Sequence, residues 1–244
     1  MYVATLIANS KNRNLSELIL KQVVNDLGGV KYKVLDDNIA VDISLVSEPS
    51  NFEIVWKQLQ KHQIDIVLQP IKNRRKNILL ADMDSTMIEQ ECIDELADEA
   101  GVGKRVAEIT KRAMNGELDF EDALIERVKL LKGLSSDIIV NVLKGRITLM
   151  PGAESLIKTM KRNGSYCALV SGGFTDFTEA ISKMLGFDEN RANTLLHENE
   201  MLSGKVQLPI LGKQAKVDAL IDISKKLNCV HDDVIAVGDG ANDL

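Results

Sequence analysis

Two short apolar runs, each followed at once by acidic residues, constrain the fold of this chain more than any other feature. Residues 78–81 (Ile-Leu-Leu-Ala) lead into residues 82–86 (Asp-Met-Asp-Ser-Thr), and residues 234–237 (Val-Ile-Ala-Val) lead into residues 238–243 (Gly-Asp-Gly-Ala-Asn-Asp). Short apolar runs bounded by turn residues are typical of buried strands, so the carboxylates are expected where two such strands end. Carboxylates this close raise one another's pKa, which calls for a hard cation, a shared proton, or both. Together the two segments predict a magnesium-dependent site for phosphoryl transfer.

The composition bounds the class of protein. With 244 residues, 45% of them hydrophobic, the chain can form one sizeable α/β core plus a smaller domain. A net charge of −6 disfavours a nucleic-acid surface, because binding to a phosphate backbone needs a basic face. No apolar stretch approaches the roughly 18 residues needed to cross a bilayer, and the first residues lack the layout of a signal peptide. Three dispersed cysteines indicate reduced thiols. We therefore expect a cytoplasmic protein with a small-molecule partner, and neither nucleic acid nor membrane as a partner.

The first 70 residues alternate between short β-rich runs and segments with helical periodicity, which predicts a small α/β domain, residues 1–70. Its expected elements are strands at 2–8 and 64–68, one or two strands within 32–46, and helices at 15–27 and 51–62. The next residues, 71–77, form a basic run after Pro70, and runs of this kind are usually solvated connectors. We place a linker there and begin the second domain, residues 78–244, at the first apolar run.

The second domain combines strand–helix alternation with a long helical insertion. Residues from about 88 to 146 interleave charged residues with Leu, Ile, Val and Ala at helical spacing, and this length predicts a helical cap rather than a single crossover helix. A strand at 166–170, helices at 177–185 and 213–227, and the strand at 234–237 follow. This order predicts a doubly wound parallel (Rossmann-like) sheet, whose sites lie beyond the carboxyl ends of the strands. Asp82, Ser171 and Asp239 all fall at such ends.

The residues at these strand ends have the chemistry needed to attack a phosphate monoester. Asp82 could attack phosphorus, while Asp84, with a pKa raised by its neighbour, could protonate the leaving oxygen and later activate water. Ser171 and the backbone at Gly172 precede a helix and could bind phosphate oxygens, and Lys216 could supply a point charge. Each signal alone has a plainer interpretation, because Asp-x-Asp and Ser-Gly-Gly also form ordinary turns and a helical lysine is usually solvated.

These motifs, in this order, resemble the four motifs of the haloacid dehalogenase-like phosphatases. The matching segments are 82–86, 171–173, Lys216 and 238–243, and the resemblance covers residues 78–244. Residues 89–101, 114–120 and 127–131 also resemble the lid of the phosphoserine phosphatases. The resemblance implies Mg²⁺-dependent hydrolysis of O-phospho-L-serine to L-serine and phosphate through a phosphoaspartyl intermediate, the last step of L-serine biosynthesis.

The resemblance also implies a role for each matching residue. Asp82 would be the nucleophile and Asp84 the general acid and base. The metal ligands would be Asp82, the Asp84 backbone carbonyl and Asp239. Asp243 would lie next to these ligands without binding the metal directly. The phosphoryl group or the attacking water would contact Ser171, Gly172, Lys216 and Asn242. In the lid, Glu91 would bind the substrate ammonium and Arg127 its carboxylate, with Met114 and Phe120 shielding the serine portion. Without the resemblance, Glu91 and Arg127 would be interpreted as charges on a solvated helix face.

Two features leave alternatives open. The chain stops at Leu244, whereas phosphoserine phosphatases continue with a helix and further strands, so we expect the second domain to be C-terminally truncated. The first domain only loosely resembles the ACT-like amino-acid-sensing domains of some relatives, and it could bind a ligand, form a homodimer or serve only in packing. A phosphotransferase that passes the phosphoryl group to another alcohol such as homoserine is one alternative function. A serine-sensing regulatory protein with an impaired catalytic half is another.

Overall fold

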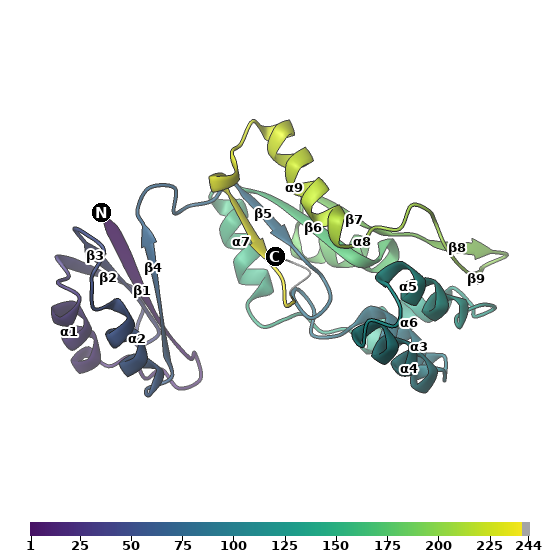
Figure 1. Ribbon diagram of the computed structural model, residues 1–244, viewed down its shortest axis with the longest axis horizontal. Coiled ribbons are helices and arrows are strands. Elements are labelled where there is room, and N and C mark those ends of the chain that lie inside the picture. The colour runs from purple at the N-terminus through teal and green to yellow at the C-terminus, as the bar shows by residue number, and fades with distance from the viewer. Residues whose placement is uncertain (241–244) are drawn as a thin grey trace. The chain divides into compact units, whose positions relative to one another are not determined.

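The computed structural model describes residues 1–240, and they form two compact units. The first unit is Met1–Arg75, and the second begins at Lys76 (Figure 1). Within residues 1–240, no helix combines the length and the apolar character needed to cross a bilayer.

The first unit is an antiparallel four-stranded sheet covered by two helices. Its elements, in chain order, are β1 (Tyr2–Ala8), α1 (Glu17–Asp26), β2 (Lys31–Asp36), β3 (Ala40–Leu45), α2 (Phe52–Gln60) and β4 (Ile64–Pro70). The strand order β2-β3-β1-β4 gives the β-α-β-β-α-β pattern of ferredoxin-like units. Alternate residues of the strands, such as Ala4, Leu6 and Ile43, pack against the helices, because successive side chains of a strand point to opposite faces. The predicted strands and helices are present, with boundaries that differ by a few residues.

Arg74 is bound to the sheet of this unit, although the sequence predicts a solvated connector there. Its guanidinium donates to both carboxylate oxygens of Asp42, at 2.6 and 2.8 Å, and to Thr5 Oγ1 at 2.9 Å. Thr5 and Asp42 lie opposite each other on β1 and β3. Burial alone would raise the pKa of Asp42, but the hydrogen bonds and charge of Arg74 hold it below its usual value. The bidentate contact fixes the end of the first unit.

The second unit is built on a parallel sheet with strand order β10-β5-β6-β7. Its strands are β5 (Ile78–Ala81), β6 (Tyr166–Phe174), β7 (Glu189–Asn193) and β10 (Val234–Val237). All four residues of β5 are buried, because both faces of the sheet are covered. Leu79 packs with α7 (Ala153–Arg162) and α8 (Thr175–Leu185), whereas Ile78 packs with α9 (Lys213–Leu227) on the other face. The predicted parallel α/β sheet is confirmed.

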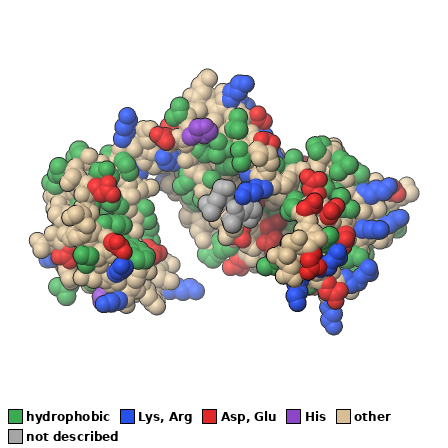
Figure 2. Space-filling view, in the orientation of Figure 1, with side chains coloured by type: hydrophobic (Ala, Val, Ile, Leu, Met, Phe, Trp, Pro, Cys, Tyr) green, Lys and Arg blue, Asp and Glu red, His purple; other side chains and the backbone are tan. Residues whose placement is uncertain are grey.

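Four helices lie between β5 and α7 in the chain: α3 (Cys92–Glu99), α4 (Gly103–Met114), α5 (Phe120–Lys129) and α6 (Asp137–Gly145). Figure 1 shows them grouped together beside a β-hairpin, β8 (Leu195–Glu198) and β9 (Met201–Val206). The apolar faces of α3, α5 and α6 share one core with the sheet. Acidic and basic side chains are interspersed over the outer surface of these helices (Figure 2). The hairpin has no counterpart among the elements expected from the sequence.

The strand that carries Ser171 is longer than the sequence predicts, which ends it at Val170. β6 continues through residues 171–173 to Phe174, and α8 begins directly at Thr175. The pairing register of β6 with β7 changes between Val170 and Phe174, so the residues between them bulge from the ladder. Bulges change the direction of side chains at the rim of a sheet. Phe174, which follows the bulge, is fully buried and holds the end of β6 in place.

Candidate active site

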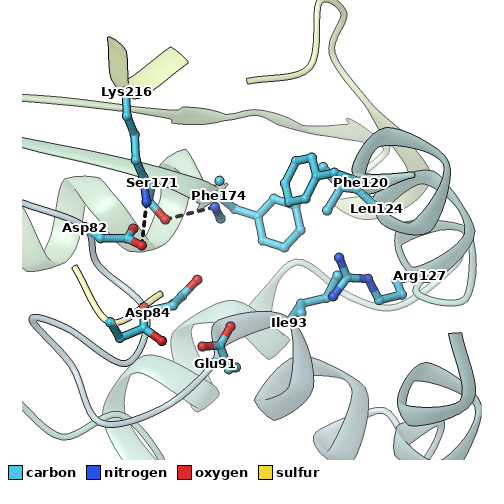
Figure 3. Close-up of a pocket in the computed structure, with 13 residues that line it drawn as sticks. Asp82, Asp84, Glu91, Ile93, Phe120, Leu124, Arg127, Ser171, Phe174 and Lys216 are labelled. Atoms are coloured by element: carbon cyan, nitrogen blue, oxygen red, sulfur yellow. Dashed lines mark hydrogen bonds and ion pairs between the residues drawn. The ribbon is translucent and has the colours of Figure 1, made fainter. Parts of the chain in front are cut away.

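A pocket of about 210 Å³ lies at the carboxyl ends of the parallel strands. Figure 3 shows the residues that line it, which come from the parallel strands and the segments that follow them, from α3 and the residue before it, from α5 and from α9. They are Asp82, Asp84, Glu91, Ile93, Phe120, Leu124, Arg127, Ser171, Gly172, Gly173, Phe174, Lys216 and Asp239.

The sheet itself brings two distant acidic segments together. β5 and β10 are parallel neighbours, with Ala81 opposite Val237. The pairing continues one residue further, where the Asp82 N–H donates to the Val237 carbonyl at 3.0 Å. Asp82 and Asp239 therefore leave adjacent strands at the same edge and line one pocket, as the sequence predicts.

Among the described residues, Lys216 and the backbone of Met83 both donate to the Asp82 carboxylate. Lys216 Nζ, on α9, donates to Oδ2 at 2.6 Å, and the Met83 N–H donates to Oδ1 at 2.7 Å. The side chain of Asp82 is 8% exposed and that of Lys216 is 14% exposed, so this ion pair is shielded from water. A shielded cation beside a carboxylate provides a site for a further anion such as a phosphoryl group.

Asp84 lies in an environment that favours a protonated carboxyl group. Burial, with smaller contributions from the Glu91 and Asp82 carboxylates, raises its pKa to about 7, although hydrogen bonds from Cys92 act in the opposite direction. The Cys92 N–H donates to Oδ1 at 3.2 Å. On the other side, a Cβ at Gly173 would lie only 2.9 Å from Oδ2. A carboxyl group that titrates near neutral pH can both donate and accept a proton.

Ser171 presents its hydroxyl to the same pocket. Its Oγ accepts the Gly173 N–H at 2.9 Å, so the hydroxyl proton is directed elsewhere and can be donated to a ligand. The Phe120 ring closes this side, because a Cβ at Gly172 would lie 3.0 Å from its Cζ. Asp119 caps α5 by accepting the Asp122 N–H at 2.8 Å, which sets Phe120 at the first position of the helix.

Arg127 lies at the other end of the pocket, and Glu91 lies between it and Asp84. Figure 3 shows the Arg127 guanidinium across the pocket from Asp82 and Asp84. Ser85 Oγ donates to Glu91 Oε1 at 2.7 Å, and burial raises the pKa of Glu91. Burial lowers the pKa of Arg127, whose Nε donates to the Ala123 carbonyl at 3.1 Å. The pocket thus offers a cation at each end, with carboxylates between them.

The donor set suits a hard cation. Within the part of the chain that the structure describes, no three His, Cys, Asp or Glu side chains lie close enough together to hold a metal by themselves. Mg²⁺ usually binds through one or two carboxylates, with water and phosphate oxygens completing the octahedron. Asp82 and Asp239, which share one pocket, fit that requirement together with a backbone carbonyl.

The structure brings most of the predicted site residues to this pocket, but not Met114. That side chain is 84% exposed at the end of α4, and it is absent from the pocket lining. At roughly 100° per residue it points about 140° away from Ile109, which faces the core. Asn242 and Asp243 lie outside the described residues.

Several residues of the site were not expected from the sequence. Ile93, Leu124 and Phe174 line the pocket, but in the sequence they are ordinary apolar positions of a helix or strand. Asn193, at the end of β7, bonds to the backbone of Gly172. Its sequence neighbourhood contains no motif, and only the pairing of β7 with β6 could have indicated it.

The comparison with known proteins agrees with this geometry. Residues 79–244 match the family model described as haloacid dehalogenase-like hydrolase. The chain belongs to the haloacid dehalogenase-like hydrolase family.

Within that family, the chain groups with the phosphoserine phosphatases. It is 43% identical over 189 residues to a phosphoserine phosphatase of Archaeoglobus fulgidus, a match that covers 77% of this chain and 55% of the relative. The chain therefore spans little more than half the length of that protein. A solved structure described as a phospho-aspartyl intermediate analogue of phosphoserine phosphatase is 44% identical, with a TM-score of 0.64, and covers 70% of this chain and 81% of that chain. A crystal structure of a haloacid dehalogenase family hydrolase from Salmonella enterica serovar Typhi is 28% identical, with a TM-score of 0.84, and the match covers 99% of this chain and 84% of that chain.

Proposed function

We propose that this chain hydrolyses O-phospho-L-serine to L-serine and inorganic phosphate, the last step of L-serine biosynthesis in the cytoplasm. The observation that carries the proposal is the distribution of charge in one pocket. The Asp82–Lys216 pair lies at one end, Arg127 lies at the other, and Glu91 lies between Asp84 and Arg127. Phosphoserine carries a phosphate at one end and both an ammonium and a carboxylate at the other, so its charges match this order.

The reaction would begin at Asp82. A carboxylate oxygen of Asp82 attacks phosphorus while the bond from phosphorus to the serine oxygen breaks, and Asp84 gives its proton to that oxygen. Water then attacks phosphorus and passes a proton to Asp84, and the Asp82 carboxylate leaves as phosphate is released. The pKa of about 7 at Asp84 supports both roles, since the group can be protonated for the first step and ionised for the second. The name of the 44% identical structure, an analogue of a phospho-aspartyl intermediate, supports the same chemistry.

The phosphoryl oxygens would be bound by groups that already face the pocket. Lys216 would supply a cation, Ser171 would supply a hydroxyl proton, and the backbone of Gly172 would supply an N–H group. Mg²⁺, held by Asp82, Asp239 and the Asp84 backbone carbonyl, would offset charge on the transferring group when bound.

The serine portion would be recognised by the helices α3 and α5, acting as part of a cap over the sheet. Arg127 can bind the substrate carboxylate through two N–H groups, and Glu91, at the N-terminus of α3, can accept from the ammonium. Phe120 would cover the serine methylene. Enclosure strengthens each charged contact, because it removes water from the pocket.

We infer further that the first unit is an ACT-like domain that binds an amino acid or forms a homodimer. Its β-α-β-β-α-β order and its ferredoxin-like strand order support this assignment. Calorimetry with L-serine, together with the molar mass in solution, would distinguish the two roles.

A phosphate-release assay tests the main proposal. We expect phosphoserine to be turned over faster than phosphothreonine or p-nitrophenyl phosphate, and only with Mg²⁺. Arg127→Ala should reduce turnover of phosphoserine much more than that of p-nitrophenyl phosphate, because the latter has no carboxylate. Equal losses on both substrates would contradict the role of Arg127. Adding homoserine should leave the phosphate yield unchanged, whereas a phosphotransferase would form phosphohomoserine instead.

A further inference from the structure

Asn193 is a buried amide that no part of the proposed reaction uses. It ends β7, and only 2% of its surface is exposed. Its Nδ2 donates to the Gly172 carbonyl at 2.8 Å and to the Leu211 carbonyl at 3.1 Å, and its Oδ1 accepts the Leu211 N–H at 2.7 Å. One side chain therefore joins two backbone segments that reach the pocket from different parts of the chain.

The first segment is the bulge that carries Ser171. The Gly172 carbonyl and the Gly173 N–H belong to the same planar peptide group. Asn193 binds the carbonyl end of this group, and Ser171 Oγ accepts from its N–H end at 2.9 Å. Because the peptide is held at both ends, it cannot rotate without breaking a hydrogen bond. The acceptor side of the Ser171 hydroxyl is thereby occupied, which leaves its proton for the pocket.

The second segment leads into the helix that carries Lys216. Leu211 is followed by Gly212, the N-cap of α9, and Lys216 lies in the first turns of that helix. The Phe120 ring rests on both segments, since a Cβ would lie 3.0 Å from it at Gly172 and 3.4 Å from it at Gly212. Asn193 therefore sets the distance between Gly172 and Gly212, the two glycines that the Phe120 ring contacts.

We propose that Asn193 is a positioning residue of the phosphoryl site: it holds the 172–173 peptide and the start of α9 in one fixed relation, so that Ser171 and Lys216 reach the same phosphoryl group. The inference rests on the proposed function. An amide is required because the position needs two donors and an acceptor. A carboxylate of the same shape has no donor and would face two carbonyl oxygens.

The test compares Asn193→Asp with a control that loses a buried hydrogen bond away from the pocket. Thr178 is fully buried, and its hydroxyl donates at 2.8 Å to Asn190, which also lies on β7. Thr178→Val should therefore lower the melting temperature without changing the site. Asn193→Ser, which introduces a hydroxyl too short to span both segments, is measured alongside Asn193→Asp and decides the test if the latter does not fold.

Three quantities are measured on the full chain with Mg²⁺: the melting temperature, the Kd of inorganic phosphate by calorimetry, and kcat and KM for phosphoserine. We expect Asn193→Asp to weaken phosphate binding by at least about tenfold and to lower kcat/KM by about ten- to a hundredfold, as small misplacements of binding groups do. Thr178→Val should leave both within about twofold. Phosphate binding within twofold of the unsubstituted chain in both Asn193 variants would overturn the inference. An unsubstituted chain that binds phosphate but releases none from phosphoserine would refute the proposed function instead, and the phosphate Kd would still decide the role of Asn193.

Discussion

Gly173→Ala is the smallest change that should disturb the chemistry of the pocket. Gly173 does not have the positive φ that only glycine adopts readily, so the effect comes from the added methyl group alone. That carbon would lie 2.9 Å from Asp84 Oδ2, 3.1 Å from Ser171 Oγ and 3.3 Å from Met83 Cε, whereas ordinary contacts begin at 3.4 Å. The carboxylate must therefore retreat, and an ordinary contact requires a shift of about 0.5 Å, which is 3.4 minus 2.9 Å.

The group that has to move is the proposed proton donor, so activity should suffer more than stability. A misplacement of about 1 Å can cost roughly a hundredfold in rate, and half of that suggests a loss of about tenfold or more in kcat for phosphoserine. The loss should be smaller for p-nitrophenyl phosphate, because nitrophenolate leaves without a proton. Overpacking should lower the free energy of unfolding by about 1–3 kcal/mol.

Gly145→Ala is the matched control. Gly145 ends α6, has no atom within 4 Å of an added Cβ and has no positive φ. It should retain full activity and gain up to about 1 kcal/mol from helix propensity. The assay is phosphate release from both substrates, with thermal unfolding measured in parallel. A Gly173→Ala protein with kcat within about threefold of the unsubstituted chain, or with equal losses on both substrates, would refute the reasoning.

Three further outcomes follow from the structure. Asp82→Asn should abolish phosphate release and leave no phosphorylated protein after incubation with labelled phosphoserine; a labelled band in that variant would rule out Asp82 as the nucleophile. Chelation of divalent metal should stop turnover and added Mg²⁺ should restore it, and unchanged activity in excess chelator would contradict a metal site at Asp82 and Asp239. Because the pKa of Asp42 is lowered in the folded state, its contribution to stability should be present above pH about 4 and be lost as the pH falls through its folded value. The difference in unfolding free energy between the unsubstituted chain and Asp42→Asn, about 1–3 kcal/mol at pH 6, should therefore shrink towards pH 3; a constant difference would show that the Arg74 ion pair is not its source.

The parts of the site that follow from the sequence are those set by strand geometry. The sequence places Asp82 and Asp239 directly after two buried strands of one parallel sheet, so both are expected at its carboxyl edge. The pairing of β5 with β10 in the structure makes these strands neighbours. Lys216 was placed correctly for a similar reason, because the predicted helix at 213–227 coincides with α9.

The remainder depends on packing that no local pattern encodes. Met114 carries the right residue type for a lid, but the rotation of α4 about its axis decides which face meets the pocket. Asn193 is interpretable only when the bulge of β6 and the loop before α9 are both in view, since its partners are backbone atoms of distant segments. Ser171 to Gly173 have turn residues, yet Phe174 continues the strand because its side chain is buried beyond them.

The bond between Arg74 and Asp42 has a practical consequence for separating the two halves of the protein. A fragment cut after Pro70 would keep every strand and helix of the first unit but would leave a partly buried carboxylate facing Thr5 without its cation. A fragment cut after Arg75 would retain that cation. The fragment of residues 1–75 should therefore unfold at a higher temperature than the fragment of residues 1–70.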